Sequence, residues 1–136
     1  MVRGRPLIPG EASGRLLRLS QPISFWGGVD PVRGIIMDPR HPQHGQSIAG
    51  KVLAIPAAVG SSSSSAIMLE LLREGTAPAA ILLGKADAIL PLGVVVGREL
   101  AYPEIPIIEL PVAAQQRLEQ GALLLVSANG EISPGE

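Results

Sequence analysis

Five consecutive serines follow a glycine near the middle of the chain. An apolar run that predicts a buried strand, 51–55, leads through a short loop to Gly60, and Ser61–Ser65 then open a helical pattern. The start of a helix presents unpaired backbone N–H groups and the positive end of the helix dipole, and both favour an anion. Residues 61–69 contain no Asp or Glu that would offset this charge. Gly60 would let a ligand approach the backbone closely.

The serine hydroxyls suit proton transfer as well as binding. A substrate carboxylate or phosphate could be held at this helix start, and a serine there can donate or accept a proton if it is desolvated or paired with a base. The alternative is an ordinary N-cap with neighbouring loop serines, which requires one hydroxyl rather than five. We therefore expect an anion site with acid/base function.

A second candidate segment carries the chain's single Phe and single Trp. Phe25 and Trp26 directly precede Gly27-Gly28 and the Asp30-Pro31 turn. In a protein with so few aromatic residues, this clustering indicates a wall for a ligand or partner rather than core packing. Ordinary turn chemistry of the Gly-Gly and Asp-Pro pairs remains the alternative.

A third segment places Asp38, His41 and His44 within seven residues. Pro39 and Pro42 hold it extended, and a loop that supplied every metal ligand without Cys would be unusual. We expect a polar loop near the mouth of an active site rather than a metal centre.

The elements that must position these residues are short. Apolar segments between the 16 Gly and 13 Pro predict strands, and Asn129-Gly130 predicts a tight turn that returns the chain as a further strand. Helices are predicted at Ser63–Glu74, ended by Gly75, and at Pro111–Gln120. The apolar sides of the first helix must be covered on more than one side. The expected strands are 14–19, 34–37, 51–55, 79–83, 105–110 and 122–127.

Composition excludes several classes of function. The 136 residues suit one α/β domain, and 46% hydrophobic with 17% charged residues is enough for a packed core. A net charge of −1, with Lys and Arg spread along the chain, argues against nucleic acid as a partner. The longest apolar runs are too short to span a bilayer, and no apolar stretch typical of a signal peptide follows the first residues. We expect a cytoplasmic protein.

The chain has no Cys, so it cannot supply thiolate ligands to an iron–sulfur cluster. Its mean hydropathy is +0.34 although only 2% of residues are aromatic. A domain of this size cannot hide so many aliphatic residues, so we expect an apolar patch for a partner, formed by the sides of the 63–74 helix and the Phe25-Trp26 loop. The alternative is a monomer that is rich in aliphatic residues and has no partner.

Taken together, these blocks resemble the aconitase X family, and specifically its small swivel subunit. The resemblance covers nearly the whole chain, and the ordered set is more specific than any single Gly-Ser loop. The residues that carry it are Ile23–Asp30, the Asp38, His41-Pro42 and Gly45 loop, Ser47–Leu53, Gly60 with Ser61 onward, Glu70–Ala79 and Gly121–Val126.

The resemblance implies a swivelling β/β/α domain over 1–136, with a barrel-like or open mixed sheet flanked by short helices. It implies the small subunit of a two-subunit hydro-lyase, inactive alone, whose large aconitase-like subunit holds an iron–sulfur cluster or metal through its own cysteines. This chain would bind no cofactor itself. In that family the Gly-Ser loop closes over a small hydroxy acid substrate and contributes the acid/base serine.

Carried over by position, the catalytic residue is Ser61, the first hydroxyl after Gly60. No metal ligand is assigned to this chain. The residues expected to bind substrate are Gly60, Ser62, Ser63, Trp26, Gly27, Gly28, Asp30 and His41.

Two dehydrations are known in the family, of cis-3-hydroxy-L-proline and of mevalonate 5-phosphate. Members that act on the phosphorylated substrate tend to carry Lys or Arg directly before the loop glycine, where this chain has Val59. The sequence therefore favours cis-3-hydroxy-L-proline, with mevalonate 5-phosphate as the alternative.

Two other classes of protein fit parts of the sequence. A phosphohistidine carrier can share a swivelling β/β/α architecture, but it needs a histidine on its active loop and residues 60–65 have none. A non-catalytic swivel or interaction module explains the apolar surplus but leaves the five serines unexplained.

Overall fold

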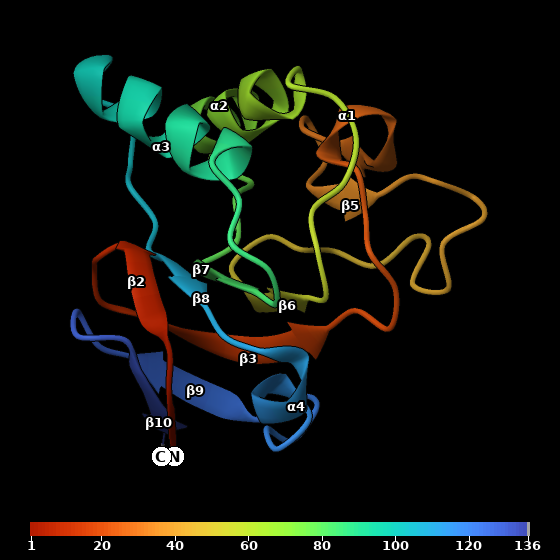
Figure 1. Ribbon diagram of the computed structural model, residues 1–136. Coiled ribbons are helices and arrows are strands. Elements are labelled where there is room, and N and C mark those ends of the chain that lie inside the picture. Colours follow the sequence, from red (N-terminus) through yellow and green to blue (C-terminus); the bar gives the residue numbers. More distant parts are fainter. Residues whose placement is uncertain (136) are drawn as a thin grey trace.

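A mixed β-sheet forms the centre of the computed structural model, which describes residues 1–135 (Figure 1). The strand order is β1-β10-β9-β3-β6-β7-β8-β2. The two edge strands, β1 and β2, are separated in the chain only by Gly4, so the sheet closes on itself like a barrel. The strands are β1 (Val2–Arg3), β2 (Arg5–Ile8), β3 (Ala12–Arg18), β6 (Val52–Ile55), β7 (Ala80–Leu83), β8 (Ile107–Glu109), β9 (Leu123–Val126) and β10 (Glu131–Pro134).

Gly4 is the residue at which the closure is made. Its N–H donates to the carbonyl of Gly130 at 2.9 Å, and a Cβ at this position would collide with the Glu109 carbonyl and the Ile108 side chain. The first strand can therefore leave β10 and join β8 within one residue only because no side chain is present there.

Strands β3, β6, β7 and β8 run parallel to one another, and the remaining pairs are antiparallel. The mixed α/β fold with a barrel-like sheet is thus confirmed, as are all six predicted strand segments and the return of the chain at Asn129-Gly130. The segment predicted at 34–37 lies outside the main sheet. It forms β5 (Ile35–Ile36), which pairs with β4 (Val29–Asp30) in a separate ribbon.

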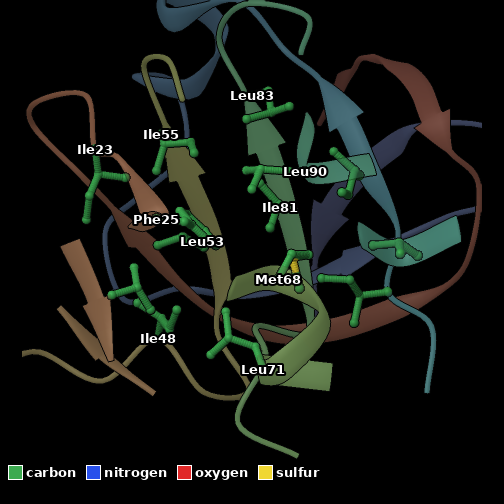
Figure 2. Close-up of a cluster of buried hydrophobic side chains, with 14 of the residues drawn as sticks. Ile23, Phe25, Ile48, Leu53, Ile55, Met68, Leu71, Ile81, Leu83 and Leu90 are labelled. Carbon is green, nitrogen blue, oxygen red and sulfur yellow. The ribbon is translucent and has the colours of Figure 1, made fainter. Parts of the chain in front are cut away.

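The central strands are buried on both faces, which explains their continuous apolar sequences. In β6, Leu53 and Ile55 belong to one buried cluster while Val52 and Ala54 belong to another. Figure 2 shows the first cluster, in which the larger residues of β6 and β7 pack against Met68 and Leu71. The small residues Ala54 and Ala80 belong to the second cluster, on the other face of the sheet. This arrangement accounts for a core built with few aromatic residues.

Two helices cover the first cluster, α2 (Ser64–Glu74) and α3 (Ile89–Glu99), and they lie side by side (Figure 1). As expected, α2 is covered on more than one side, by the sheet and by α3. A Cβ on Gly93 would collide with the Met68 side chain and the Ser65 carbonyl, so this glycine allows the two helices to approach closely. Helix α3 was not predicted from the sequence.

The predicted helix at Pro111–Gln120 is a single turn, α4 (Val112–Gln115). Gln115, the last residue of this turn, points into the protein, 1% exposed, and its Nε2 donates to the carbonyls of Ile55, Leu82 and Leu110 at 3.1, 3.4 and 3.0 Å. Gln115 therefore satisfies backbone carbonyls at the carboxyl-terminal end of the parallel strands. No helix within residues 1–135 is both long enough and apolar enough to cross a bilayer.

Candidate functional site

Three loops meet at the carboxyl ends of the parallel strands, where ligands bind in many α/β proteins. They follow β3, β6 and β7, and they lead into α1 (Phe25–Gly28), α2 and α3 respectively. The topology thereby brings the predicted Trp26 segment and the serine segment together, although they are separated by more than 30 residues in the chain.

Backbone pairing holds the first two loops side by side. Ile23 pairs in parallel with Ala58, and the Val59 N–H donates to the Ile23 carbonyl at 3.1 Å. Gly60 follows with φ of +98°, and a Cβ there would collide with Ser24 Oγ. The chain can turn at this point only with glycine.

The five serines have different roles. Ser61 is exposed, and its Oγ accepts the Ser63 N–H at 3.0 Å in the turn before α2. Ser64 is buried, 5% exposed, and its Oγ accepts the Trp26 N–H at 3.1 Å. Ser65 Oγ donates to the Ser62 carbonyl at 2.9 Å. Ser61 therefore combines exposure with a hydrogen-bonded oxygen.

A pocket of about 70 Å³ opens between the loops that follow β6 and β7. Gly60 and Ser61 line this pocket together with Asp87, a residue that was not selected from the sequence. Asp87 Oδ2 accepts the Leu90 N–H at 2.9 Å and so caps α3. An Asp directly before an apolar run, here 88–90, is a helix-start signal that could have identified it. The lining residues are Ala58, Val59, Gly60, Ser61, Ser64, Asp87, Ile89 and Leu90.

An open groove of about 460 Å³ lies beside the α1 turn. Gly27 has φ of +83° with free space around it, so the turn exposes its backbone to the groove. Trp26 is 56% exposed, whereas Phe25 is 1% exposed and packs in the core. The prediction that both aromatic residues form a wall is therefore wrong for Phe25. The groove is lined by Ser24, Trp26, Gly27, Gly28, Asp38, Pro39 and Arg40.

Asp38 and Arg40 give the groove its charge. Asp38 Oδ1 accepts the Arg40 N–H at 2.9 Å and lies 3.6 Å from the Arg40 guanidinium. The backbone hydrogen bond from Arg40, and to a lesser degree its charge, hold the pKa of Asp38 below its usual range despite some burial. Arg40, which the sequence analysis did not select, places a cation at the groove that can meet a substrate carboxylate.

His41 and Asp30 line neither the pocket nor the groove. His41 is buried, with Nδ1 accepting the Gln43 N–H at 3.0 Å and Nε2 lying 3.2 Å from the Gln21 carbonyl. Both ring nitrogens therefore order the loop. A substrate-binding role for this side chain stays a prediction.

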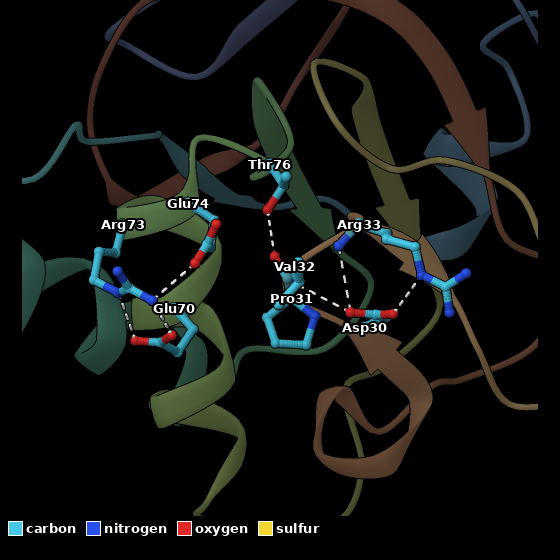
Figure 3. A network of polar contacts seen from close by, with 8 residues as sticks. All are labelled: Asp30, Pro31, Val32, Arg33, Glu70, Arg73, Glu74 and Thr76. Atoms are coloured by element: carbon cyan, nitrogen blue, oxygen red, sulfur yellow. Dashed lines mark hydrogen bonds and ion pairs between the residues drawn. The ribbon is translucent and has the colours of Figure 1, made fainter.

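Asp30 is committed to its own turn (Figure 3). Oδ1 accepts the N–H groups of Val32 and Arg33 at 3.0 and 3.3 Å, and Oδ2 pairs with the Arg33 guanidinium at 2.8 Å. The side-chain hydrogen bond from Arg33 is the main reason that the pKa of Asp30 is lowered. The neighbouring Thr76 Oγ1 donates to the Pro31 carbonyl at 2.6 Å and ties this turn to the end of α2.

Residues 1–135 contain no cluster of three or more His, Cys, Asp or Glu side chains suited to a metal ion. The His41 ring is directed to backbone groups rather than toward Asp38. The donor set of residues 1–135 therefore does not fit an iron–sulfur cluster or a metal centre.

The sequence of this chain is similar to a known protein family and to individual members of it. Residues 1–133 match the family described as the aconitase X swivel domain. The chain is 46% identical over 107 residues to a cis-3-hydroxy-L-proline dehydratase of Pseudomonas aeruginosa, which covers 79% of this chain but only 18% of that protein. It is 43% identical over 95 residues to a phosphomevalonate dehydratase small subunit of Thermococcus gammatolerans, covering 70% of this chain and 72% of that one.

A solved structure shows the same fold. The crystal structure of Thermococcus kodakaraensis aconitase X in its holo form contains a chain that superposes with a TM-score of 0.85 at 34% identity. The match covers 98% of this chain and 97% of the other. This chain thus spans less than a fifth of the Pseudomonas relative but nearly the full length of the crystallised chain.

Proposed function

Because the chain belongs to the aconitase X swivel domain family, we propose that it is the small subunit of a dehydratase and that it supplies the proton-transfer serine, Ser61, to an active site completed by a larger subunit. The single observation that carries the proposal is the convergence of the Gly60-Ser61 loop with the Trp26 loop at the carboxyl ends of β6 and β3.

The chemistry of Ser61 follows from its position. Loss of water breaks a C–O bond and transfers a proton from the neighbouring carbon to a base, and a serine oxygen can take that proton only if its negative charge is stabilised. The Ser63 N–H already donates to Ser61 Oγ, and no acidic residue lies in the first turn of α2. Both features favour negative charge on the Ser61 oxygen, against the opposing effect of the Asp87 carboxylate in the same pocket.

The remaining site residues bind and orient the substrate in this proposal. Ser62, which is exposed, and Ser63, which is half-buried, directly follow Ser61 in the chain. Trp26 and the Gly27-Gly28 backbone form one wall of the neighbouring groove, and Arg40 can pair with a carboxylate there. A substrate that spans the pocket and the groove would contact both loops.

The leaving hydroxyl needs a Lewis acid, which a metal or iron–sulfur centre of the larger subunit would supply. The residues of this chain do not fit such a centre, since the chain has no Cys and residues 1–135 offer no ligand cluster. We therefore assign this chain the proton transfer and the substrate contacts only.

The substrate that this site favours is cis-3-hydroxy-L-proline. Asp87 is the one charged residue in the lining of the pocket, all of which the structure describes, and Val59 occupies the position before the loop glycine. A carboxylate in the lining of the pocket disfavours a phosphate dianion there but tolerates a protonated ring amine. The Pseudomonas relative is named for this substrate.

The proposal is tested by producing the chain together with the larger subunit from the same genome and assaying both substrates. We expect the complex to dehydrate cis-3-hydroxy-L-proline and the isolated chain to be inert. Turnover of mevalonate 5-phosphate alone would overturn the substrate assignment. Turnover of neither substrate by a metal-loaded complex, or turnover by the isolated chain, would overturn the function.

A further inference from the structure

Helix α3 is apolar on two opposite faces. Its inner face consists of Leu90, Gly93, Val94 and Gly97, which are buried against α2 and the sheet. On its outer face Leu92 is 53% exposed, Val95 40% and Val96 39%, and Leu100 just after the helix is 52% exposed. A helix with apolar side chains on both its inner and its outer face is normally covered on both.

The outer face of α3 continues the rim of the Ser61 pocket. Ile89 and Val59 both line that pocket, and Val59 is 49% exposed. Leu92 and Val96 follow Ile89 at helical spacings of three and seven, so the three side chains share one face. We call the set Val59, Ile89, Leu92, Val95 and Val96 the α3 stripe.

The size of the pocket requires a second wall. Ligand pockets usually have about 300–1,000 Å³, whereas this one has about 70 Å³. A substrate held at Ser61 must therefore be enclosed by another surface, and a surface that closes over the pocket at Val59 and Ile89 also lies over the start of α3.

We propose that the α3 stripe is the docking surface for the larger dehydratase subunit, which covers it with a complementary apolar surface. This inference rests on the proposed function. In the Pseudomonas relative the matching segment is only 18% of one polypeptide, so most of that protein lies outside the part equivalent to this chain. The partner is the polypeptide that corresponds to this remainder.

The stripe adds to the contacts expected from the sequence. The apolar sides of α2 are already covered by the sheet and α3, and Phe25 is in the core, so of those expected contacts Trp26, 56% exposed, is the one that stays available. The five residues of the stripe are uncharged, and the stripe ends at the exposed Glu99, which follows Val95 and Val96 at helical spacings of four and three. Beside it, the Arg98 guanidinium pairs with Glu104 at 3.0 Å, consistent with a polar rim around an apolar centre.

The test uses Leu92→Glu and, as a milder variant, Val96→Gln, each titrated against the purified larger subunit by calorimetry. Both side chains are solvent-exposed, so the free subunit should keep its thermal unfolding temperature. We expect the Kd to rise at least about tenfold for Leu92→Glu. Turnover should return when the variant is added in excess. Leu125→Glu on β9, where Leu125 is 45% exposed, is the matched control and should leave the Kd unchanged.

The outcomes separate this inference from the proposed function. An unchanged Kd for both stripe variants, in a complex that still dehydrates its substrate, overturns the docking surface and leaves the function intact. A weakened complex together with no turnover by the wild-type pair supports the surface and contradicts the function. Self-association of the free chain that Leu92→Glu abolishes, with no change in Kd for the larger subunit, would assign the stripe to a second copy and overturn the inference.

Discussion

Ser64 Oγ accepts the backbone N–H of Trp26 at 3.1 Å, so the first turn of α2 fixes the turn that follows β3. This bond joins the two segments that form the candidate site. It is also shielded from water, because Ser64 is 5% exposed. Of the five serines, Ser64 is therefore the one that positions the site rather than the one that acts in it.

Replacement of Ser64 by alanine should destabilise the chain. The Trp26 N–H would lose its acceptor in a part-buried position, which costs about 1–3 kcal/mol, and the groove beside Trp26 should loosen. Urea unfolding measures the free-energy change. Ser65→Ala is the control, because its half-exposed hydroxyl bonds only the Ser62 carbonyl, and it should cost about 0.5–1.5 kcal/mol or nothing. Equal effects of the two changes would contradict the positioning role of Ser64.

Gly60→Ala should be more damaging than Gly45→Ala. Both glycines have positive φ, +98° and +88°, so each alanine pays a similar backbone cost of about 1–2 kcal/mol. The new methyl group at 60 would also collide with Ser24 Oγ, whereas the space around Gly45 is free within 4 Å. The larger loss of thermal stability, and a loss of turnover in the complex, should follow only the change at 60. Similar stability of both variants would show that the approach of Gly60 to Ser24 is not required.

The strands and the serine loop could be predicted from the sequence, but not which serine is exposed in the pocket and which one is buried against Trp26. The strand, glycine and helix-start pattern was local, so the position of Ser61 after β6 could be predicted from it. The role of Ser64 could not, because its partner Trp26 lies 38 residues away and reaches it only through the pairing of Ile23 with Ala58. The closure of the sheet at Gly4 is similarly non-local.

Helix α3 was missed because its composition is that of a strand. Three consecutive valines, 94–96, and the nearby Pro91 and Gly93 all have low helix propensity. Tertiary packing overrides this preference, since the two glycines at 93 and 97 lie against α2 and allow a close helix contact. The helical spacing of the buried residues Leu90, Gly93, Val94 and Gly97 was the available signal.

Two arginines should control two carboxyl groups independently (Figure 3). Hydrogen bonding from Arg73 lowers the pKa of Glu70 below its ordinary 4.5, and hydrogen bonding from Arg33 lowers that of Asp30 below 3.8. Because the pKa values are depressed in the folded state, the stability that these pairs contribute is present above those ordinary values and is lost as the pH falls through the lowered ones.

Arg73→Gln should therefore raise the pKa of Glu70 toward 4.5 and leave that of Asp30 unchanged, and Arg33→Gln should do the reverse. Titration of the side-chain carboxyl carbons by NMR measures both. Each variant should also lose less stability than the wild type on acidification through the affected range. A shift of both carboxyl groups by one substitution would show that the two pairs are coupled, contrary to their separate contacts.

The catalytic assignment of Ser61 needs variants that separate its two roles. Ser61 Oγ caps the turn before α2 by accepting the Ser63 N–H, so Ser61→Ala removes both this bond, at a cost of about 0.5–2 kcal/mol, and the hydroxyl. Ser61→Asn keeps a side-chain acceptor for the cap but has no hydroxyl. Ser61→Thr keeps both.

The turnover number of these three variants, assembled with the larger subunit and confirmed as intact complexes, is the most direct measurement of the central claim. General acid/base groups typically contribute about 10²–10⁴-fold, so Ser61→Ala and Ser61→Asn should both lose turnover to that extent with a smaller change in KM, while Ser61→Thr recovers most of it. Near-normal turnover of Ser61→Asn or Ser61→Ala in an intact complex would contradict the account and reduce Ser61 to a cap beside the substrate.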